Sequence, residues 1–353
     1  MRDWLPRMAQ SYARVGITPV AAYAAARVGI AESLLSGVTT VADHHLSWPA
    51  EGDGIDIARA VERAARELGA RVVFVRGSAG GDAEATAASA DAIAAELAPA
   101  RGGVSEDGLV QVALGPAGVH SDGEATFRLM GDVADDRDLR RRTQSNEQVD
   151  VERAMRDYGR RPLELLDEWG WLTPRTTLAH LCDVTAEEIA LLASRGCFAT
   201  HAPGCDVPMG WGVAPVRALL DAGIDVGLGT SGGGSNDAGH LLADARLAMQ
   251  VSALVGPQLS AESVLTSATA GSARGLGRAE LGNLELGAAG DIVVWDVSGV
   301  ADAGVADPVA GLLWAHPGRR PRHVLVAGRF VVRDYRLVRA DEDEIVAAAA
   351  EIA

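Results

Sequence analysis

Short apolar runs rich in β-branched residues alternate with amphipathic helical patterns through the first 230 residues of the chain. The runs with strand character cover residues 37–45, 71–78, 109–118, 138–147, 175–184, 197–204 and 224–230, of which 138–147 is the weakest. Helical patterns lie between them, and the one at 185–196 opens with Thr185 and Glu188, the spacing of a capping box. This alternation is typical of right-handed βαβ units around a parallel sheet.

The fold class expected from this pattern is α/β, most simply a (β/α)8-type TIM barrel over residues 1–277. From about residue 278 the pattern changes to hairpin-like strands with glycine turns, at 281–297 and 319–338. We expect residues 278–340 to form a small appended β element and residues 341–353 a C-terminal helix. The three segments are our predicted domain organisation.

Charge and composition narrow the class of partner. The chain has 353 residues, of which 48% are hydrophobic, and a formal net charge of −16. Nucleic acid and anionic membranes need clustered Lys and Arg, so we expect neither as a partner. No run of 18 apolar residues occurs, and the three cysteines match no zinc or redox spacing, so we expect reduced thiols in a cytoplasmic protein. A small-molecule substrate is the partner that remains.

Polar side chains follow most of the predicted strands. In a parallel barrel the C-terminal ends of all strands meet at one rim, where the reactive groups lie. The residues at these ends are Asp43, His44, Arg76, His120, Gln144, Glu147, His180, His201, Ser231 and Asn236. Their convergence from several strands predicts a single site.

The glycine-rich corner "GLGTSGGGSND" at 227–237 permits three interpretations. Successive backbone N–H groups could form an anion-binding nest. Ser, Asn and Asp could simply cap the helix that follows. The third interpretation, that Ser231 stands at a former active-site position, depends on a resemblance.

The order of motifs resembles the amidohydrolase superfamily, in the branch of 8-oxoguanine deaminase, guanine deaminase and the chlorotriazine hydrolases. The resemblance runs from about residue 18 to about 340, through "GVTTVADHH", "VRGS", "LAHLCDVTAEEI", "ATHAPG", "GSNDAGHLL", "LGNLELGAAGDIVVWD", "DPVAGLLWA" and "VLVAGRFVV". It implies a metal-dependent barrel that hydrolyses bonds on amidine-like carbons of heterocycles. It also implies that the appended element is a remnant of the family's small β-sandwich domain.

Carried over residue by residue, the resemblance implies a degraded metal site. The family binds its metal through a His-x-His after the first strand, single histidines after the fifth and sixth strands, and an Asp after the eighth. Gln144 stands at the fifth-strand histidine, and Ser231 stands at the Asp. His180 matches the sixth-strand ligand, Glu147 the family's proton-moving Glu, and His201 its substrate-contacting histidine. The first strand has no counterpart, so it is missing or replaced.

We therefore expect no cofactor and no metal, with Gln144, His180 and Ser231 as vestigial metal positions. Zinc enzymes hold three protein ligands and a water, and a single surviving histidine would bind weakly. Acid–base work is then expected from Glu147, His180 and His201. The residues expected to contact the substrate are Arg76, Gln144, Ser231 and Asn236.

Three functions follow from these expectations. The first is a C–N hydrolase of the aminohydrolase lineage that has diverged to a metal-independent mechanism on a small nitrogen heterocycle or amide-like substrate. The second is a non-catalytic relative that binds a ligand or a partner subunit. The third is a conventional deaminase, dependent on zinc or iron, whose coding sequence begins further upstream. Open strand edges favour pairing with another chain, so we also expect a homodimer or other oligomer.

Overall fold

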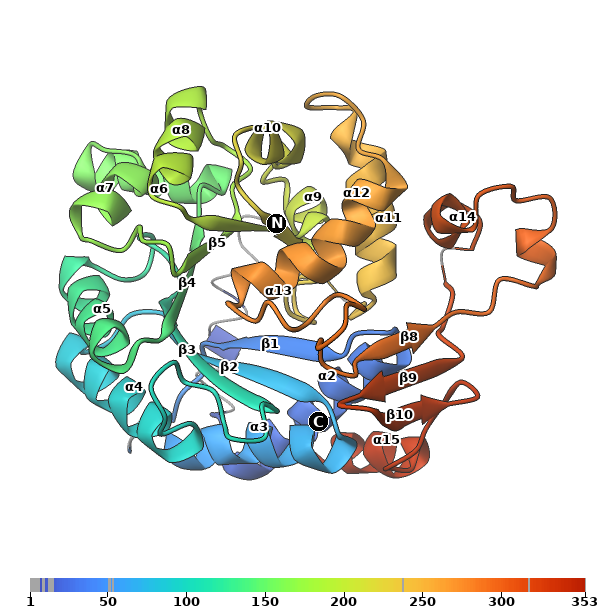
Figure 1. The fold of residues 1–353 in the computed structure, drawn as a ribbon. Coiled ribbons are helices and arrows are strands. Elements are labelled where there is room, and N and C mark those ends of the chain that lie inside the picture. Colours follow the sequence, from blue (N-terminus) through green and yellow to red (C-terminus); the bar gives the residue numbers. More distant parts are fainter. Residues whose placement is uncertain are drawn as a thin grey trace.

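The structure is a computed structural model that describes residues 7, 10, 11, 16–49, 52, 54–236, 238–316 and 318–352. Seven parallel strands form one curled sheet in sequence order (Figure 1). They are β1 (Thr40–His45), β2 (Arg71–Ser78), β3 (Val110–Pro116), β4 (Arg140–Ser145), β5 (Thr176–His180), β6 (Phe198–His201) and β7 (Val226–Leu228). Within the described residues β1 and β7 are the two edges of this sheet, so it is a half-barrel. The expected α/β barrel-type fold is confirmed.

Helices cover the outer face of the curled sheet, as Figure 1 shows. They are α2 (Pro19–Leu35), α3 (Ile55–Leu68), α4 (Ala83–Leu97), α5 (Glu124–Arg137), α6 (Gln148–Tyr158), α7 (Pro162–Glu168), α8 (Ala186–Ser194), α10 (Val216–Asp221), α11 (Leu241–Ser252) and α12 (Ala261–Thr266). Helix α9 (Pro203–Met209) directly follows β6 at the strand ends. After a π-helical turn at Ser267–Gly271, α13 (Ser272–Gly275) contacts the inner face, where the side chains of Arg140 and Thr177 donate to the carbonyl oxygen of Gly275. The capping box predicted at Thr185 and Glu188 is present at the start of α8. None of the helices described is both long and apolar enough to cross a membrane.

Strand register decides which side chains enter the half-barrel. Val73 and Val75 of β2 pack with Ala113 on the inner face, whereas Val72 and Phe74 join the large core beneath the helices. Both faces are therefore buried, as expected for a parallel sheet covered by helices. Side chains alternate along a strand, and partners in register share a face.

The β4 strand has arginines where a buried strand would normally have apolar residues. Arg140 is in register with Ala113, so Arg140 and Arg142 lie on the inner face. Next to them, a Cβ added to Gly115 of β3 would overlap the carbonyl oxygen of Arg142. Only glycine lets the two backbones approach this closely. Inward-facing arginines explain why residues 138–147 look so little like a strand in the sequence.

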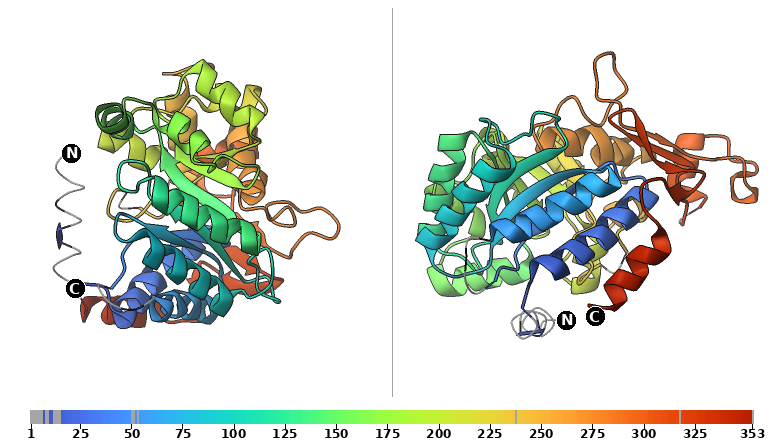
Figure 2. Two further views of the ribbon diagram at one scale, coloured as in Figure 1. Left: turned by 90° about the vertical axis from the view of Figure 1, so that its left-hand side faces the viewer. Right: turned by 90° about the horizontal axis from the view of Figure 1, so that it is seen from below.

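A second, four-stranded antiparallel sheet lies beside the half-barrel (Figure 1). Its strands are β8 (Ile292–Val294), β9 (His323–Val326), β10 (Arg329–Arg333) and β11 (Arg336–Leu337). A short 3-10 turn (Val300–Asp302) and α14 (Pro308–Trp314) lie between β8 and β9, and α15 (Glu342–Ala350) packs against α2 (Figure 2). The boundaries at 277 and 340 stay a prediction.

Candidate functional site

The ends of β4, β5 and β6 bring a histidine and two carboxylates together. His180, the last residue of β5, has its Nδ1 2.6 Å from Oδ1 of Asp206. Its Nε2 lies 3.7 Å from Oε1 of Glu147. All three side chains are at most 4% exposed. The histidine is therefore held between two buried carboxylates, away from bulk water.

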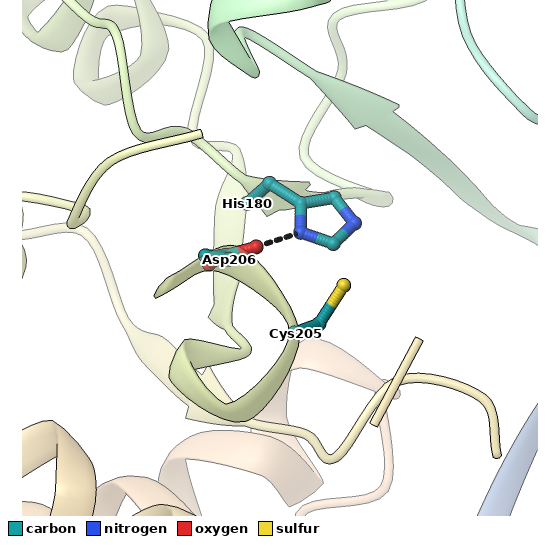
Figure 3. A group of neighbouring side chains, drawn as sticks. All are labelled: His180, Cys205 and Asp206. Carbon is teal, nitrogen blue, oxygen red and sulfur yellow. Dashed lines mark hydrogen bonds and ion pairs between the residues drawn. The ribbon is translucent and has the colours of Figure 1, made fainter. Parts of the chain in front are cut away.

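Helix α9 positions two of the side chains that surround His180. It begins at Pro203, directly after β6, so Cys205 and Asp206 lie in its first turn. The backbone N–H of Gly204 donates to Oδ1 of Asp244 on α11 at 2.8 Å. A Cβ at Gly204 would overlap this carboxylate, so glycine allows α11 to approach and fix the turn. Figure 3 shows the Cys205 sulfur pointing from α9 toward the His180 ring, while Asp206 faces Nδ1.

Glu147 is fixed by the loop after β4. The preceding residue, Asn146, has a left-handed backbone with φ of 57°. Its N–H donates to Oδ2 of Asp150 at 2.9 Å, and its side-chain amide donates to the carbonyl oxygen of Asp183 at 2.8 Å. The other carboxylate oxygen of Asp150 contacts Nδ1 of His120 at 3.2 Å. This network aims Glu147 inward while leaving its Oε2 without a hydrogen-bond partner.

Burial sets the charge states at this site. Burial, with help from the Asp150 carboxylate, raises the pKa of Glu147. Burial opposes protonation of His180, but Asp206 and Glu147 outweigh it and raise the pKa of that histidine. Burial lowers the pKa of His201 to about 4. At neutral pH the site thus combines the Glu147 carboxyl, which retains its proton more readily than usual, with His201, which is neutral.

The glycine corner is a surface turn beside this site. Ser231 is exposed, has a φ of 62°, and its Oγ lies 3.1 Å from that of Ser235. The side-chain amide of Asn236 donates to the carbonyl oxygen of Thr230 at 2.8 Å and to Asp244 at 3.1 Å. Asn236 therefore ties the corner to α11. Ser231 and Asn236 do not cap that helix, because its N-cap is His240, and Asp237 lies outside the described residues.

Two other predicted site residues, Gln144 and Arg76, lie on opposite faces of the sheet. Gln144 is in register with Ala179 and lies on the inner face, half-buried. Arg76 shares its face with Phe74, toward the helices, where its guanidinium lies 4.3 Å from the centre of the Trp48 ring and its Nε donates to Ser89 at 3.2 Å. The structure therefore does not bring Arg76 to the site. Burial lowers the pKa of Arg76 to about 10.

Sequence reasoning missed Asp206 and Asp150. Asp206 follows a strand by five residues and Asp150 lies within a helix, so neither stood at a predicted strand end. Cys205 was interpreted only as a packing thiol. A signal was present in "HAPGCD", where a cysteine and an aspartate follow His201 within five residues. The sequence alone did not show that they turn back toward His180.

Two groups of described residues have donor atoms that could hold a metal ion. In each, one ligand atom per residue lies within 4.8 Å of the others: His180, Cys205 and Asp206 in the first, and His120, Glu147 and Asp150 in the second. Gln144 and Ser231, the positions implied by the family resemblance, offer only an amide and an exposed alcohol. The residues present therefore fit a metal, although not at those two positions.

Comparison with curated proteins finds hydrolytic deaminases. The chain is 35% identical over 345 residues to the 8-oxoguanine deaminase of Pseudomonas aeruginosa, covering 94% of this chain and 76% of that protein. It is 34% identical over 327 residues to a 5-methylthioadenosine/S-adenosylhomocysteine deaminase of Natronomonas pharaonis, covering 90% and 72%. Among solved structures, the atrazine chlorohydrolase of Arthrobacter aurescens TC1 complexed with zinc superposes with a TM-score of 0.93 at 35% identity. That superposition covers 100% of this chain and 82% of the other.

The expectation of no metal cofactor is wrong. The solved relative was complexed with zinc, and this chain itself presents two groups of buried or partly buried donors of the right types. The expectation failed because it considered only the positions inherited from the family. A metal cofactor is better supported than none.

The comparisons and the fold agree on the family. The amidohydrolase family model matches residues 1–331, nearly the whole chain. The half-barrel with its appended antiparallel sheet matches the solved relatives over their shared length. The chain belongs to the amidohydrolase family.

Proposed function

We propose that this chain is a hydrolase that cleaves an exocyclic C–N or similar bond on a small nitrogen heterocycle, with Glu147, His180 and His201 at its active site. The observation that carries this proposal is the buried array in which His180 lies between Asp206 and Glu147. Relatives named for 8-oxoguanine, methylthioadenosine and atrazine support the substrate class, because all three compounds carry a leaving group on a ring carbon flanked by nitrogen.

Glu147 is the residue proposed to move the proton. Its raised pKa keeps a proton on the carboxyl group closer to neutral pH, where it can be donated to a leaving nitrogen. The unpartnered Oε2 is the atom free to contact the substrate.

His180 is proposed to position the reacting groups. Its Nδ1 contact with Asp206 fixes the ring orientation and leaves Nε2 directed toward Glu147. His201 is buried beside it and, being neutral, can share a hydrogen bond with a heterocycle without introducing charge. The group of His180, Cys205 and Asp206 would hold a metal ion, which when bound supplies Lewis acidity and lowers the pKa of water.

The test is turnover by the metal-supplemented full-length chain. Ammonia release from 8-oxoguanine and 5-methylthioadenosine, and loss of atrazine, are measured with wild type and with Glu147→Gln. We expect turnover of at least one compound and a fall in kcat of about 100-fold or more in the variant, because a positioned proton donor contributes that much. Glu152→Gln, on the exposed face of the same helix α6, is the matched control and should retain the wild-type rate.

Two results would contradict the proposal. An unchanged rate in Glu147→Gln would remove this residue from the mechanism. No turnover of any of the three compounds by folded, metal-loaded protein would instead favour the non-catalytic binding function.

A further inference from the structure

Two buried polar atoms face each other at the site without a hydrogen-bond partner. They are Oδ2 of Asp206 and Nδ1 of His201, which lie 3.8 Å apart. The two residues are 0% and 3% exposed. Leaving such atoms unsatisfied costs about 1–3 kcal/mol each. The separation is too long for a hydrogen bond between them and close to the spacing of two ligands on one small cation, for which each bond is about 2.0–2.2 Å.

A thiol lies at the same place. Cys205 is 1% exposed, and its sulfur lies within 4.8 Å of ligand atoms of both His180 and Asp206. Cys182, on the loop after β5, has its thiol within hydrogen-bonding reach of the Asp206 carboxylate. Nitrogen, oxygen and sulfur donors therefore converge on one small volume between the end of β5 and the first turn of α9 (Figure 3).

We propose that His180, Cys205 and Asp206 form a relocated, sulfur-containing site for a zinc-class divalent cation, in which Gln144 takes no part. His201 lies beside this group, with its unpartnered Nδ1 facing Oδ2 of Asp206. Imidazole, carboxylate and thiolate are the ligands that zinc combines in four-coordinate protein sites. Without the ion, His180 and Asp206 satisfy each other through their 2.6 Å contact.

The second donor group is less suited to a cation. Both carboxylate oxygens of Asp150 are already used, one by Nδ1 of His120 and the other by the backbone N–H of Asn146. The side chain of His120 is 24% exposed, and the group has no sulfur donor. Binding there would break the contacts that fix the loop after β4. At the relocated site, the contact that binding would exchange most directly is the one between His180 and Asp206.

The neighbouring charges also favour a cation. Glu147 lies 3.7 Å from Nε2 of His180, and Asp244 holds the first turn of α9 through Gly204. Arg142 is the opposing charge on the inner face, and its effect on His180 is weaker than that of Asp206 or Glu147. The site thus lies among more carboxylates than guanidinium groups.

Cobalt substitution tests the sulfur ligand directly and without a substrate. Metal-free full-length chain is titrated with Co²⁺, and the absorption spectrum is recorded. We expect about one cobalt per chain, with a thiolate-to-cobalt charge-transfer band. Cys205→Ser should abolish the band, whereas Cys197→Ser should retain it. Cys197 is the matched control, because it is also buried but its sulfur contacts the carbonyl oxygen of Thr173.

Zinc affinity tests the remaining ligands. Competition with a chromophoric chelator should show a loss of about 100-fold or more in Asp206→Asn, since even residues that only support a ligand cost 10–100-fold. Gln144→Ala should bind zinc as wild type does. Zinc should raise the Tm of wild type but not of Asp206→Asn, which provides a second measurement if Cys205→Ser fails to fold.

Several outcomes would overturn the relocated site. Cobalt bound without a thiolate band, loss of zinc in Gln144→Ala, or no metal binding by folded wild type would each do so. Because these measurements need no substrate, the metal site can be established even if the proposed hydrolase activity is not found. The hydrolase activity can likewise be established if the relocated metal site is not found.

Discussion

Several residues at strand ends near the site have backbone conformations in the left-handed region, which is costly for residues other than glycine, and three of them carry polar side chains. They are Asn146, His180 and Ser231, with φ of 57°, 78° and 62°. Each such residue costs about 1–3 kcal/mol, so the surrounding contacts must maintain it. Asn146 is held by Asp150, and His180 by Asp206. Ser231 is exposed, and its hydroxyl contacts Ser235 within its own turn and the Cys205 thiol of α9.

His44 predicts a dependence of stability on pH. It lies on the inner face with Nε2 2.7 Å from the carbonyl oxygen of Gly115, and burial lowers its pKa to about 4. The unfolded chain protonates this histidine near pH 6.5, so between pH 6.5 and 4 the unfolded state binds more protons. The free energy of unfolding therefore falls on acidification through this range, by at most about 3 kcal/mol for this residue, and by less because its side chain is partly exposed.

Urea unfolding at pH 4.5 and 7 measures this effect. His44→Asn should reduce the difference in the free energy of unfolding between the two pH values, while His201 maintains part of it. The same substitution at His316, which is exposed, should leave the difference unchanged. An identical pH dependence in His44→Asn and wild type would show that this histidine titrates normally in the folded state.

At the scale of elements, the junction of β3 and β4 depends on a close backbone approach. A Cβ at Gly115 would overlap the carbonyl oxygen of Arg142, which belongs to the neighbouring strand and cannot move independently. The β4 strand carries Gln144 at its end and leads directly into the loop that holds Glu147. The position of the proposed proton donor therefore depends on a glycine in the preceding strand, one βα unit earlier in the chain.

Gly115→Ala should be strongly destabilising. We expect a loss of at least about 2 kcal/mol in the free energy of unfolding, or no soluble folded protein, because a buried overlap with backbone cannot be relieved by a rotamer change. Gly256→Ala is the control, since no atom lies near a Cβ at that position, and should change stability by less than about 1 kcal/mol. Thermal unfolding of the two variants side by side makes the comparison; equal stabilities would show that β3 and β4 can separate without cost.

At the scale of the whole molecule, a buried ion pair joins the half-barrel to the antiparallel sheet. Nε and one terminal nitrogen of Arg71, the first residue of β2, donate to Asp291 at 2.8 and 3.0 Å. The side chains are 6% and 5% exposed, and Asp291 also accepts from the backbone N–H of Ala327. This carboxylate therefore connects the two sheets. The expected oligomer stays a prediction, although both edges of the half-barrel are unpaired within the described residues.

Asp291→Ala should destabilise the chain by about 3–5 kcal/mol, because it leaves the Arg71 guanidinium buried without its counter-charge. The exposed pair between Arg322 and Asp334, 52% and 63% exposed, is the matched control. Asp334→Ala should change the free energy of unfolding by no more than about 1 kcal/mol. Urea unfolding measures both. A small effect in Asp291→Ala would mean that water reaches Arg71 once the carboxylate is removed.

The sequence by itself determined the α/β barrel-type architecture, the appended antiparallel strands and the family. These properties depend on periodicity and on the order of motifs, which are local along the chain. The positions of Glu147, His180 and His201 near one another also followed, because parallel strands end at a common rim. The expectation of no metal failed, because it compared single positions with a family pattern.

Only the tertiary structure decided which donors face one another. Cys205 and Asp206 reach His180 because α9 turns back over the end of β5 and is held there by Asp244 of α11, a residue 38 positions further along the chain than Asp206. Arg76 does not lie at the site, because strand register directs its side chain toward the helices. Neither result is encoded in a local pattern, since contacts between distant segments depend on how the strands twist and how closely the helices pack.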